Sequence, residues 1–176
     1  MDNQNKGITK VLLEKNNQYQ SEYLDVFSYH VNGQSPKIAV LTCADSRVIP
    51  EFIFHATIGE LFVVRIAGNI AVGRTVLSSL EYAVNHLKIS QLIILGHTHC
   101  GAIKAAESSP DDTSLLIQEI TKSFDLNQKD HVRANLTRQL TMLPKRSKVI
   151  SDAISDGSLK LLGAIYHLKD GHVEFI

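Results

Sequence analysis

The sequence predicts an α/β fold around a mostly parallel central β-sheet of about five strands. Three short, nearly continuous apolar runs are typical of strands that are covered on both faces, and they lie at Lys37–Cys43, Leu61–Ala67 and Gln91–Gly96. Between the second and third runs, apolar side chains recur with helical spacing over Val76–Leu87. Strand, helix and strand alternating in this way indicate parallel strands joined by right-handed crossovers, with helices on both faces of the sheet.

The chain before the first strand is expected to form an N-terminal helical arm over residues 1–30. Apolar side chains are interspersed with polar ones over Lys10–Phe27, which fits one or two amphipathic helices. A glycine, a serine and a proline between positions 33 and 36 then interrupt the chain. We therefore expect an α/β core over residues 31–176, and one domain over the whole chain, residues 1–176.

Further helices are expected after the third strand. A short helix is predicted over Ser114–Phe124, and helical character returns over His131–Leu143 and Ser147–Ile154, where Pro144 is expected to separate the two helices.

The C-terminus reads as a β-hairpin. Two apolar runs, Leu159–Leu168 and His172–Ile176, are joined by the turn Lys169-Asp170-Gly171, and an Asp-Gly pair between apolar runs is a strong hairpin signal. The last strand is therefore expected to be antiparallel and to lie at an edge of the sheet.

The composition excludes several classes of protein. Eighteen Lys and Arg balance eighteen Asp and Glu in 176 residues, so there is no basic excess of the kind that a nucleic-acid-binding or anionic-membrane-binding surface usually carries. No apolar run approaches the ~20 residues that span a bilayer, and the N-terminus lacks a secretory signal pattern. We therefore expect a cytoplasmic protein without a nucleic-acid or membrane partner. Two cysteines cannot form a disulfide framework.

Both cysteines follow predicted parallel strands. Cys43 ends the first strand, while His97 and Cys100 follow the third. Ligands of open α/β sheets bind beyond the carboxyl ends of the strands. Two thiols and one imidazole that meet there can supply Cys₂His, a ligand set of catalytic zinc that leaves one position for water. Two alternatives are inert buried cysteines and a redox pair, although no Cys-x-x-Cys spacing supports the latter.

Asp45 and Arg47 lie two residues apart just after Cys43, so their side chains can share one side of the loop. In a functional site, Arg47 would hold the Asp45 carboxylate in a bidentate fork, and Asp45 would accept a hydrogen bond from zinc-bound water. Asp45 could instead become a fourth ligand, or the pair could be an ordinary solvated ion pair.

Cys-x-Asp-x-Arg, followed about fifty residues later by His-x-x-Cys, resembles the β-class carbonic anhydrases. The resemblance extends over most of the chain and includes Leu12–Asn16, Gly33–Lys37, Cys43–Pro50, Phe62–Arg65, Ala67–Asn69, Glu81–Val84, Gly96–Ile103 and Gly163–Tyr166. It implies one Zn²⁺ per chain on Cys43, His97 and Cys100, with Asp45 and Arg47 as the catalytic pair beside it. The implied reaction is the reversible hydration of CO₂ to bicarbonate and a proton through zinc-bound hydroxide.

Three residues match the substrate pocket of the plant-like members, which keep an open site. These are Gln34, nine residues before the first zinc cysteine, and the aromatic residues Phe62 and Tyr82. The Gly101 amide, together with Gln34, could donate hydrogen bonds to the oxygen charge that develops during attack on CO₂. His99, at a variable position between the metal ligands, is open to three interpretations: a proton relay, a stray metal ligand or an exposed loop residue.

The resemblance also implies a homodimer or a higher even-numbered homo-oligomer, with the pocket near the subunit boundary. Two other functions remain open at this point. The same zinc site could hydrolyse COS or CS₂, or the chain could be a zinc-stabilised binding or sensing protein without turnover.

Overall fold

The computed structural model describes residues 2–124 and 129–176, and the side chains from residue 7 onward. Within it the chain divides into two compact units, Met1–Gln34 and Ser35–Ile176, and each is described by itself. The predicted organisation as one domain over residues 1–176, which also includes residues outside this description, stays a prediction.

The first unit is a single helix, α1 (Asp2–His30), rather than two shorter ones. It begins earlier and ends later than the predicted amphipathic segment. Aromatic side chains one and two turns apart support its second half, because the ring of Tyr19 lies 4.9 Å from that of Tyr23 and 5.4 Å from that of Phe27, measured between centroids. Large apolar side chains along α1, such as Leu12 and Leu24, are exposed.

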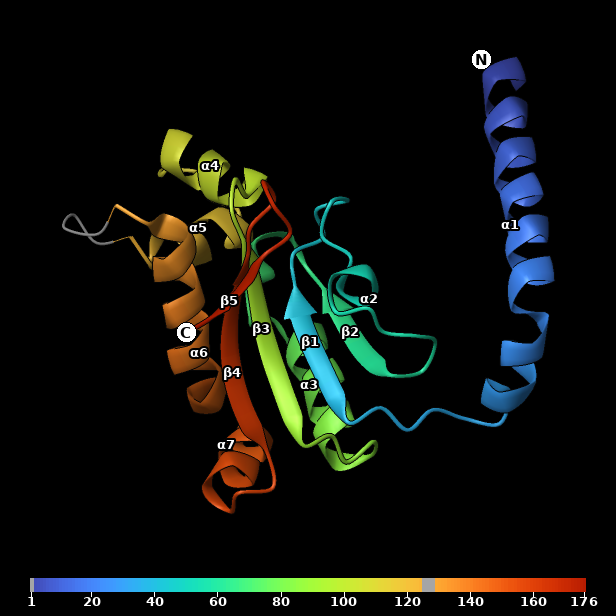
Figure 1. The fold of residues 1–176 in the computed structure, drawn as a ribbon. Helices are drawn as coiled ribbons and strands as arrows, with labels where there is room; N and C mark the ends of the chain where they lie inside the picture. Colours follow the sequence, from blue (N-terminus) through green and yellow to red (C-terminus); the bar gives the residue numbers. More distant parts are fainter. Residues whose placement is uncertain (1, 125–128) are drawn as a thin grey trace. The chain divides into compact units, whose positions relative to one another are not determined.

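The second unit is built on the predicted five-stranded sheet, with strand order β2-β1-β3-β4-β5. Its strands are β1 (Ile38–Thr42), β2 (Leu61–Arg65), β3 (Gln91–His97), β4 (Lys160–Tyr166) and β5 (Val173–Phe175). The first four are parallel to one another, and β5 pairs with β4 antiparallel at the edge (Figure 1). This confirms the mostly parallel sheet and its C-terminal hairpin.

Each helix predicted in this unit is present, apart from the break expected at Pro144. The helical elements are α2 (Pro50–Ile53), the 3₁₀ turn η1 (Ala67–Asn69), α3 (Arg74–Asn85), α4 (Gly101–Ser108), α5 (Leu115–Thr121), α6 (His131–Arg146) and α7 (Lys148–Ser155). The short elements α2 and η1 were not predicted.

The expected break at Pro144 is wrong, because α6 continues through it to Arg146. Pro144 has no backbone N–H to donate, so the helix passes through it with one backbone hydrogen bond fewer. The Arg146 side chain offsets this loss through contacts with the Ala71 carbonyl and Glu119. The break lies instead at Ser147, whose hydroxyl accepts a hydrogen bond from the Ile150 amide and so caps the start of α7.

The sheet separates two hydrophobic cores. On one face, α3, α6 and α7 pack on strand residues such as Leu41 and Ile94. On the other face, strand residues such as Val40 and Leu95 lie beneath α2 and its neighbouring loops. None of the described helices is long and apolar enough to cross a membrane.

The order of the strands determines where a ligand can bind. The chain leaves β1 toward β2 at one edge, and leaves β3 toward β4 on the other side, although β1 and β3 are neighbours. Such a reversal opens a crevice at the carboxyl ends of the two strands, where α/β proteins bind their ligands. A third cluster of buried residues lies at this end, and it contains Cys43, Cys100 and side chains of α4 and α5.

Candidate metal centre

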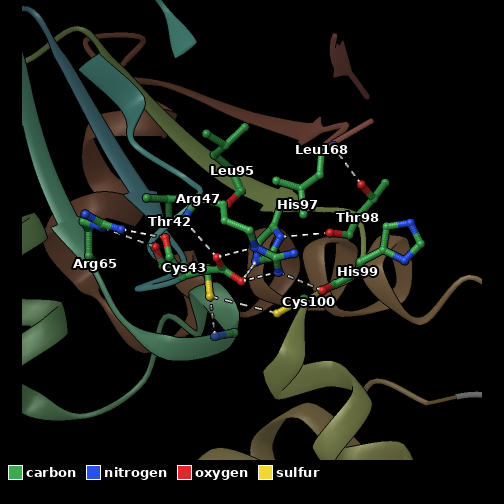
Figure 2. Close-up of polar contacts among 12 residues, drawn as sticks. Thr42, Cys43, Arg47, Arg65, Leu95, His97, Thr98, His99, Cys100 and Leu168 are labelled. Carbon is green, nitrogen blue, oxygen red and sulfur yellow. Dashed lines mark hydrogen bonds and ion pairs between the residues drawn. The ribbon is translucent and has the colours of Figure 1, made fainter. Parts of the chain in front are cut away.

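Three side chains from two strand ends form the only group with metal-ligand geometry among the described residues. Cys43 directly follows β1, His97 ends β3 and Cys100 precedes α4. One ligand atom from each of them lies within 4.8 Å of the other two, and all three residues are buried. Figure 2 shows the three side chains converging at this point. The structure therefore brings together the three residues that the sequence predicts as metal ligands, and these residues are called the metal group below.

The His97 ring is oriented so that one nitrogen is free to bind a metal. Its Nδ1 lies 3.0 Å from the Thr98 carbonyl oxygen. Because a carbonyl only accepts, Nδ1 carries a proton, and in the neutral imidazole Nε2 then holds the lone pair. Nε2 is buried and has no hydrogen-bond partner among the described residues. A buried nitrogen of this kind is costly unless something binds it, so the ring fits a metal ligand.

The two cysteines are not joined in a disulfide. Their sulfur atoms lie 4.0 Å apart. The hydrogen bond from the Cys100 thiol lowers the pKa of Cys43 to about 4, and the same interaction raises the pKa of Cys100. This interaction favours a thiolate at Cys43. A cation bound between the two sulfurs would favour the thiolate form of both.

The predicted pair of Asp45 and Arg47 is formed. The Asp45 carboxylate accepts hydrogen bonds from Arg47 Nε at 2.9 Å and Nη2 at 2.7 Å, and a third from the Arg47 backbone amide at 3.0 Å. These bonds hold the pKa of Asp45 well below its usual range. Asp45 Oδ2 lies 3.9 Å from His97 Nε2, so the carboxylate borders the metal group without belonging to it.

Two further residues that sequence reasoning left without a role hold the ligand loop. Arg65 donates to the Asp45 carbonyl at 2.7 Å and to the Cys43 carbonyl at 3.4 Å. The Gly68 amide donates to Cys43 Sγ at 3.3 Å. Arg65 pairs in register with Thr42, so the strand-end rule that pointed to Cys43 would also have pointed to the end of β2.

The predicted substrate-binding aromatics lie away from the metal group of the same chain. Phe62 and Tyr82 are neighbours, with ring centroids 6.2 Å apart. Phe62 is in register with Ala39, four residues before Cys43, which places it roughly 13 Å from Cys43 along the strands at about 3.3 Å per residue. Within one chain the structure therefore does not bring these rings to the cysteines.

The other predicted positions are less informative. Gly101 is the first residue of α4, so its amide is one of the free donors of a helix start. His99 is exposed, has a left-handed φ of 55° and presents its carbonyl to Arg47 at 3.4 Å, whereas its ring does not join the metal group. Gln34 is exposed and belongs to the first unit, so its role stays a prediction.

An open pocket of about 830 Å³ borders the metal group on the side of Cys100. Its lining includes His99, Cys100, Ile103 and His131. The His131 ring stacks on Phe124 with centroids 4.1 Å apart and lies 2.8 Å from the Glu107 carboxylate. Solvent and small molecules therefore have a route to the region of Cys100.

Comparison with known proteins gives one consistent family. A family model described as carbonic anhydrase matches residues 38–173. Carbonic anhydrase 2 of Mycobacterium tuberculosis is 34% identical over 168 residues, which cover 88% of this chain and 81% of that protein. The carbonic anhydrase of Mycolicibacterium smegmatis is 36% identical over 156 residues, covering 81% and 75%.

Solved structures agree with these relatives. The β-carbonic anhydrase CcaA superposes with a TM-score of 0.80 at 29% identity, covering 99% of this chain and 92% of that one. The Coccomyxa β-carbonic anhydrase, solved in complex with acetazolamide, gives a TM-score of 0.78 at 27% identity, covering 97% and 85%.

Proposed function

The chain belongs to the β-carbonic anhydrase family, and on this premise we propose that it hydrates CO₂ reversibly to bicarbonate and a proton at a zinc site formed by Cys43, His97 and Cys100. The observation that carries the proposal is the buried group of two sulfurs and one imidazole at the ends of β1 and β3. Two thiolates and a neutral imidazole are ligands that zinc prefers, and three of them leave a position for water.

The donor set fits one Zn²⁺ per chain. His97 presents an unpartnered Nε2, and the two sulfurs lie 4.0 Å apart. When bound, zinc lowers the pKa of a coordinated water and so supplies a nucleophile near neutral pH. The protein has to hold the three ligands, orient the proton of that water and keep the site accessible to CO₂.

Asp45 performs the orienting step in this proposal. While it is ionised, its carboxylate accepts hydrogen bonds and donates none, and Arg47 keeps it ionised by holding its pKa low. Arg47 also fixes both oxygens, so that Oδ2 faces the metal group from 3.9 Å away. Asp45 would thus accept a hydrogen bond from the attacking water, which would direct a lone pair of that water toward CO₂. Because both oxygens are bonded to Arg47, the carboxylate is held as a neighbour of the metal, which favours an open site over a fourth ligand.

The Gly101 amide is proposed to stabilise the negative charge that develops on the substrate oxygens. As CO₂ becomes bicarbonate, negative charge forms on its oxygens, and an amide at the start of α4 can donate to one of them. Gln34 is proposed to donate a second hydrogen bond from its side-chain amide.

We further propose that Phe62 and Tyr82 serve the metal group of a second copy, in a homodimer or a higher even-numbered oligomer. Their distance from Cys43 in one chain supports this, as do the exposed apolar side chains along α1, which a second copy would bury. Chains with Cys43→Ser and chains with Tyr82→Ala should each be inactive alone. When the two are co-expressed, activity should return, because one site of the mixed oligomer then combines the intact Cys43 of one chain with the intact Tyr82 of the other. If no activity returns, Phe62 and Tyr82 do not serve the metal group of a second copy.

The main test combines zinc analysis with stopped-flow CO₂ hydration on the purified protein. One zinc per chain and rapid, acetazolamide-sensitive hydration are expected. Zinc without turnover would instead indicate a zinc-stabilised binding protein, and faster hydrolysis of COS or CS₂ than hydration of CO₂ would assign a different substrate to the same site.

A further inference from the structure

The sulfur of Cys43 receives a hydrogen bond from a backbone amide that is itself unusually placed. Gly68 N donates to Cys43 Sγ at 3.3 Å. Gly68 lies in the turn η1 with a left-handed φ of 68°, a conformation from which glycine leaves easily because it lacks a side chain. Something outside the turn must therefore hold this residue if its amide is to stay directed at the sulfur.

A buried side chain of α6 holds the other side of Gly68. Asn135 Nδ2 donates to the Gly68 carbonyl at 2.9 Å, and the Asn135 side chain is fully buried. The amide and the carbonyl of Gly68 flank the same Cα, so holding the carbonyl restricts the rotation that would turn the amide away from Cys43. Asn135 is 67 residues from Gly68 in the sequence.

The orientation of Asn135 is in turn determined by backbone groups. The Ala71 amide can only donate, so Gln139 presents Oε1 to it at 3.0 Å. Gln139 Nε2 then donates to Asn135 Oδ1 at 3.1 Å, which leaves Asn135 Nδ2 for the Gly68 carbonyl. A flipped Asn135 amide would place two donors against each other on one side and two acceptors on the other. The side chain therefore has a single satisfied orientation.

The same network ends in a buried ion pair. Arg146 Nη1 donates to Gln139 Oε1 at 3.2 Å and to the Ala71 carbonyl at 2.9 Å, while Nη2 pairs with the buried carboxylate of Glu119. Buried polar groups cost stability unless all are paired, so a connected network behind a ligand sulfur indicates a positional role.

We propose that Asn135 is a positioning residue for the metal site, which fixes Gly68 so that its amide remains bonded to the Cys43 sulfur. The inference rests on the proposed zinc site and adds a residue that touches neither metal nor substrate. The amide draws charge from the thiolate and orients it. Residues that orient ligands in this way typically change metal affinity by roughly 10- to 100-fold when they are removed.

The test compares Asn135→Leu with Leu136→Ala in the full chain. Asn135→Leu keeps the approximate size of the side chain but removes the donor to Gly68. Leu136 is the next residue of α6, fully buried in the core between α6 and the sheet, so its truncation lowers stability without touching the Cys43 network. The readouts are the zinc dissociation constant by chelator competition and the thiolate-to-metal charge-transfer band of the Co²⁺-substituted protein.

Asn135→Leu should bind zinc roughly 10- to 100-fold more weakly and shift the cobalt band to lower energy, because a thiolate without its hydrogen bond is easier to oxidise. Leu136→Ala should lower Tm and leave both readouts unchanged. The inference is overturned if Asn135→Leu matches the parent, or if Leu136→Ala shifts both readouts equally. A parent that binds no zinc overturns the proposed site and the inference with it.

A measurement on the parent keeps the test decisive if Asn135→Leu does not fold. In the zinc-loaded parent the Gly68 amide should be strongly protected from hydrogen exchange through its bond to the Cys43 sulfur. Rapid exchange of this amide overturns the inference without any variant. The smaller substitution Asn135→Ser should lower its protection and weaken zinc binding in the same direction.

Discussion

Replacing Asp45 by asparagine separates the metal site from the catalytic step. The parent carboxylate accepts three hydrogen bonds from Arg47, and its Oδ2 faces the metal group. Asparagine has one oxygen and one NH₂ group, so it cannot accept both guanidinium bonds and also accept a hydrogen bond from water at the Oδ2 position. The variant therefore loses the ionised acceptor while all three zinc ligands remain.

The size of the effect follows from the bonds that are lost. One hydrogen bond to a charged group is worth about 1.5–3 kcal/mol, which corresponds to roughly 10- to 150-fold in rate. We therefore expect kcat/KM for CO₂ hydration to fall about 100-fold, while the zinc content stays at that of the parent.

The assay is stopped-flow hydration with a pH indicator, paired with metal analysis of the same samples. Asp152→Asn is the matched control, because Asp152 is also paired with a cation, Lys148, but on the exposed surface of α7. It should leave turnover unchanged. Full zinc and parental turnover in Asp45→Asn would remove Asp45 from the mechanism.

Four other perturbations probe the site and its support. Cys43→Ser should lose most of the zinc, and full retention would refute its role as a ligand. Gly68→Ala should lower Tm more than Gly157→Ala: both positions have left-handed φ values, 68° and 79°, but only at Gly68 would the new Cβ meet a buried side chain of α5, at 2.7 Å, and equal shifts would contradict that clash. Burial alone would raise the pKa of Glu119, but two arginines lower it below the ordinary 4.5. Because its pKa is lower in the folded state, Glu119 stabilises the fold above about pH 4.5 and loses this contribution as the pH falls. Glu119→Gln should lower the free energy of unfolding by roughly 3 kcal/mol at neutral pH and should reduce the decline of that free energy at acidic pH, both measured by urea unfolding. An unchanged decline at acidic pH would contradict the assignment. Activity should rise with pH across neutrality, because two thiolates reduce the charge on zinc and leave the water less acidic than at a three-histidine site; a rate that is flat from about pH 6 to about pH 9 would contradict this account.

The metal ligands could be predicted because their positions follow from local patterns and one topological rule. Apolar runs placed β1 and β3, and parallel strands end at the same edge of the sheet. Cys43 and Cys100 were therefore expected at the same edge of the sheet, and the adjacency of β1 and β3, which the sequence did not predict, brings their sulfurs to 4.0 Å from each other. The Asp45–Arg47 pair could be predicted because the two residues are only two positions apart in the sequence.

The support of the site could not be predicted in this way. Asn135 belongs to a helix whose polar residues have no periodic signature of a site, and its bond to Gly68 depends on how α6 packs against η1. The continuation of α6 through Pro144 has the same cause, because contacts of Arg146 with distant residues outweigh a local propensity. Local sequence rules carry no information on such contacts.

X-ray absorption at the zinc edge of the purified protein tests the central claim most directly. Two sulfur atoms at about 2.3 Å and lighter atoms at about 2.0–2.1 Å are expected, with one sulfur lost from the residual zinc of Cys43→Ser. A spectrum with nitrogen and oxygen neighbours alone, or a protein that binds no zinc, would contradict the assignment of Cys43, His97 and Cys100 as the metal ligands.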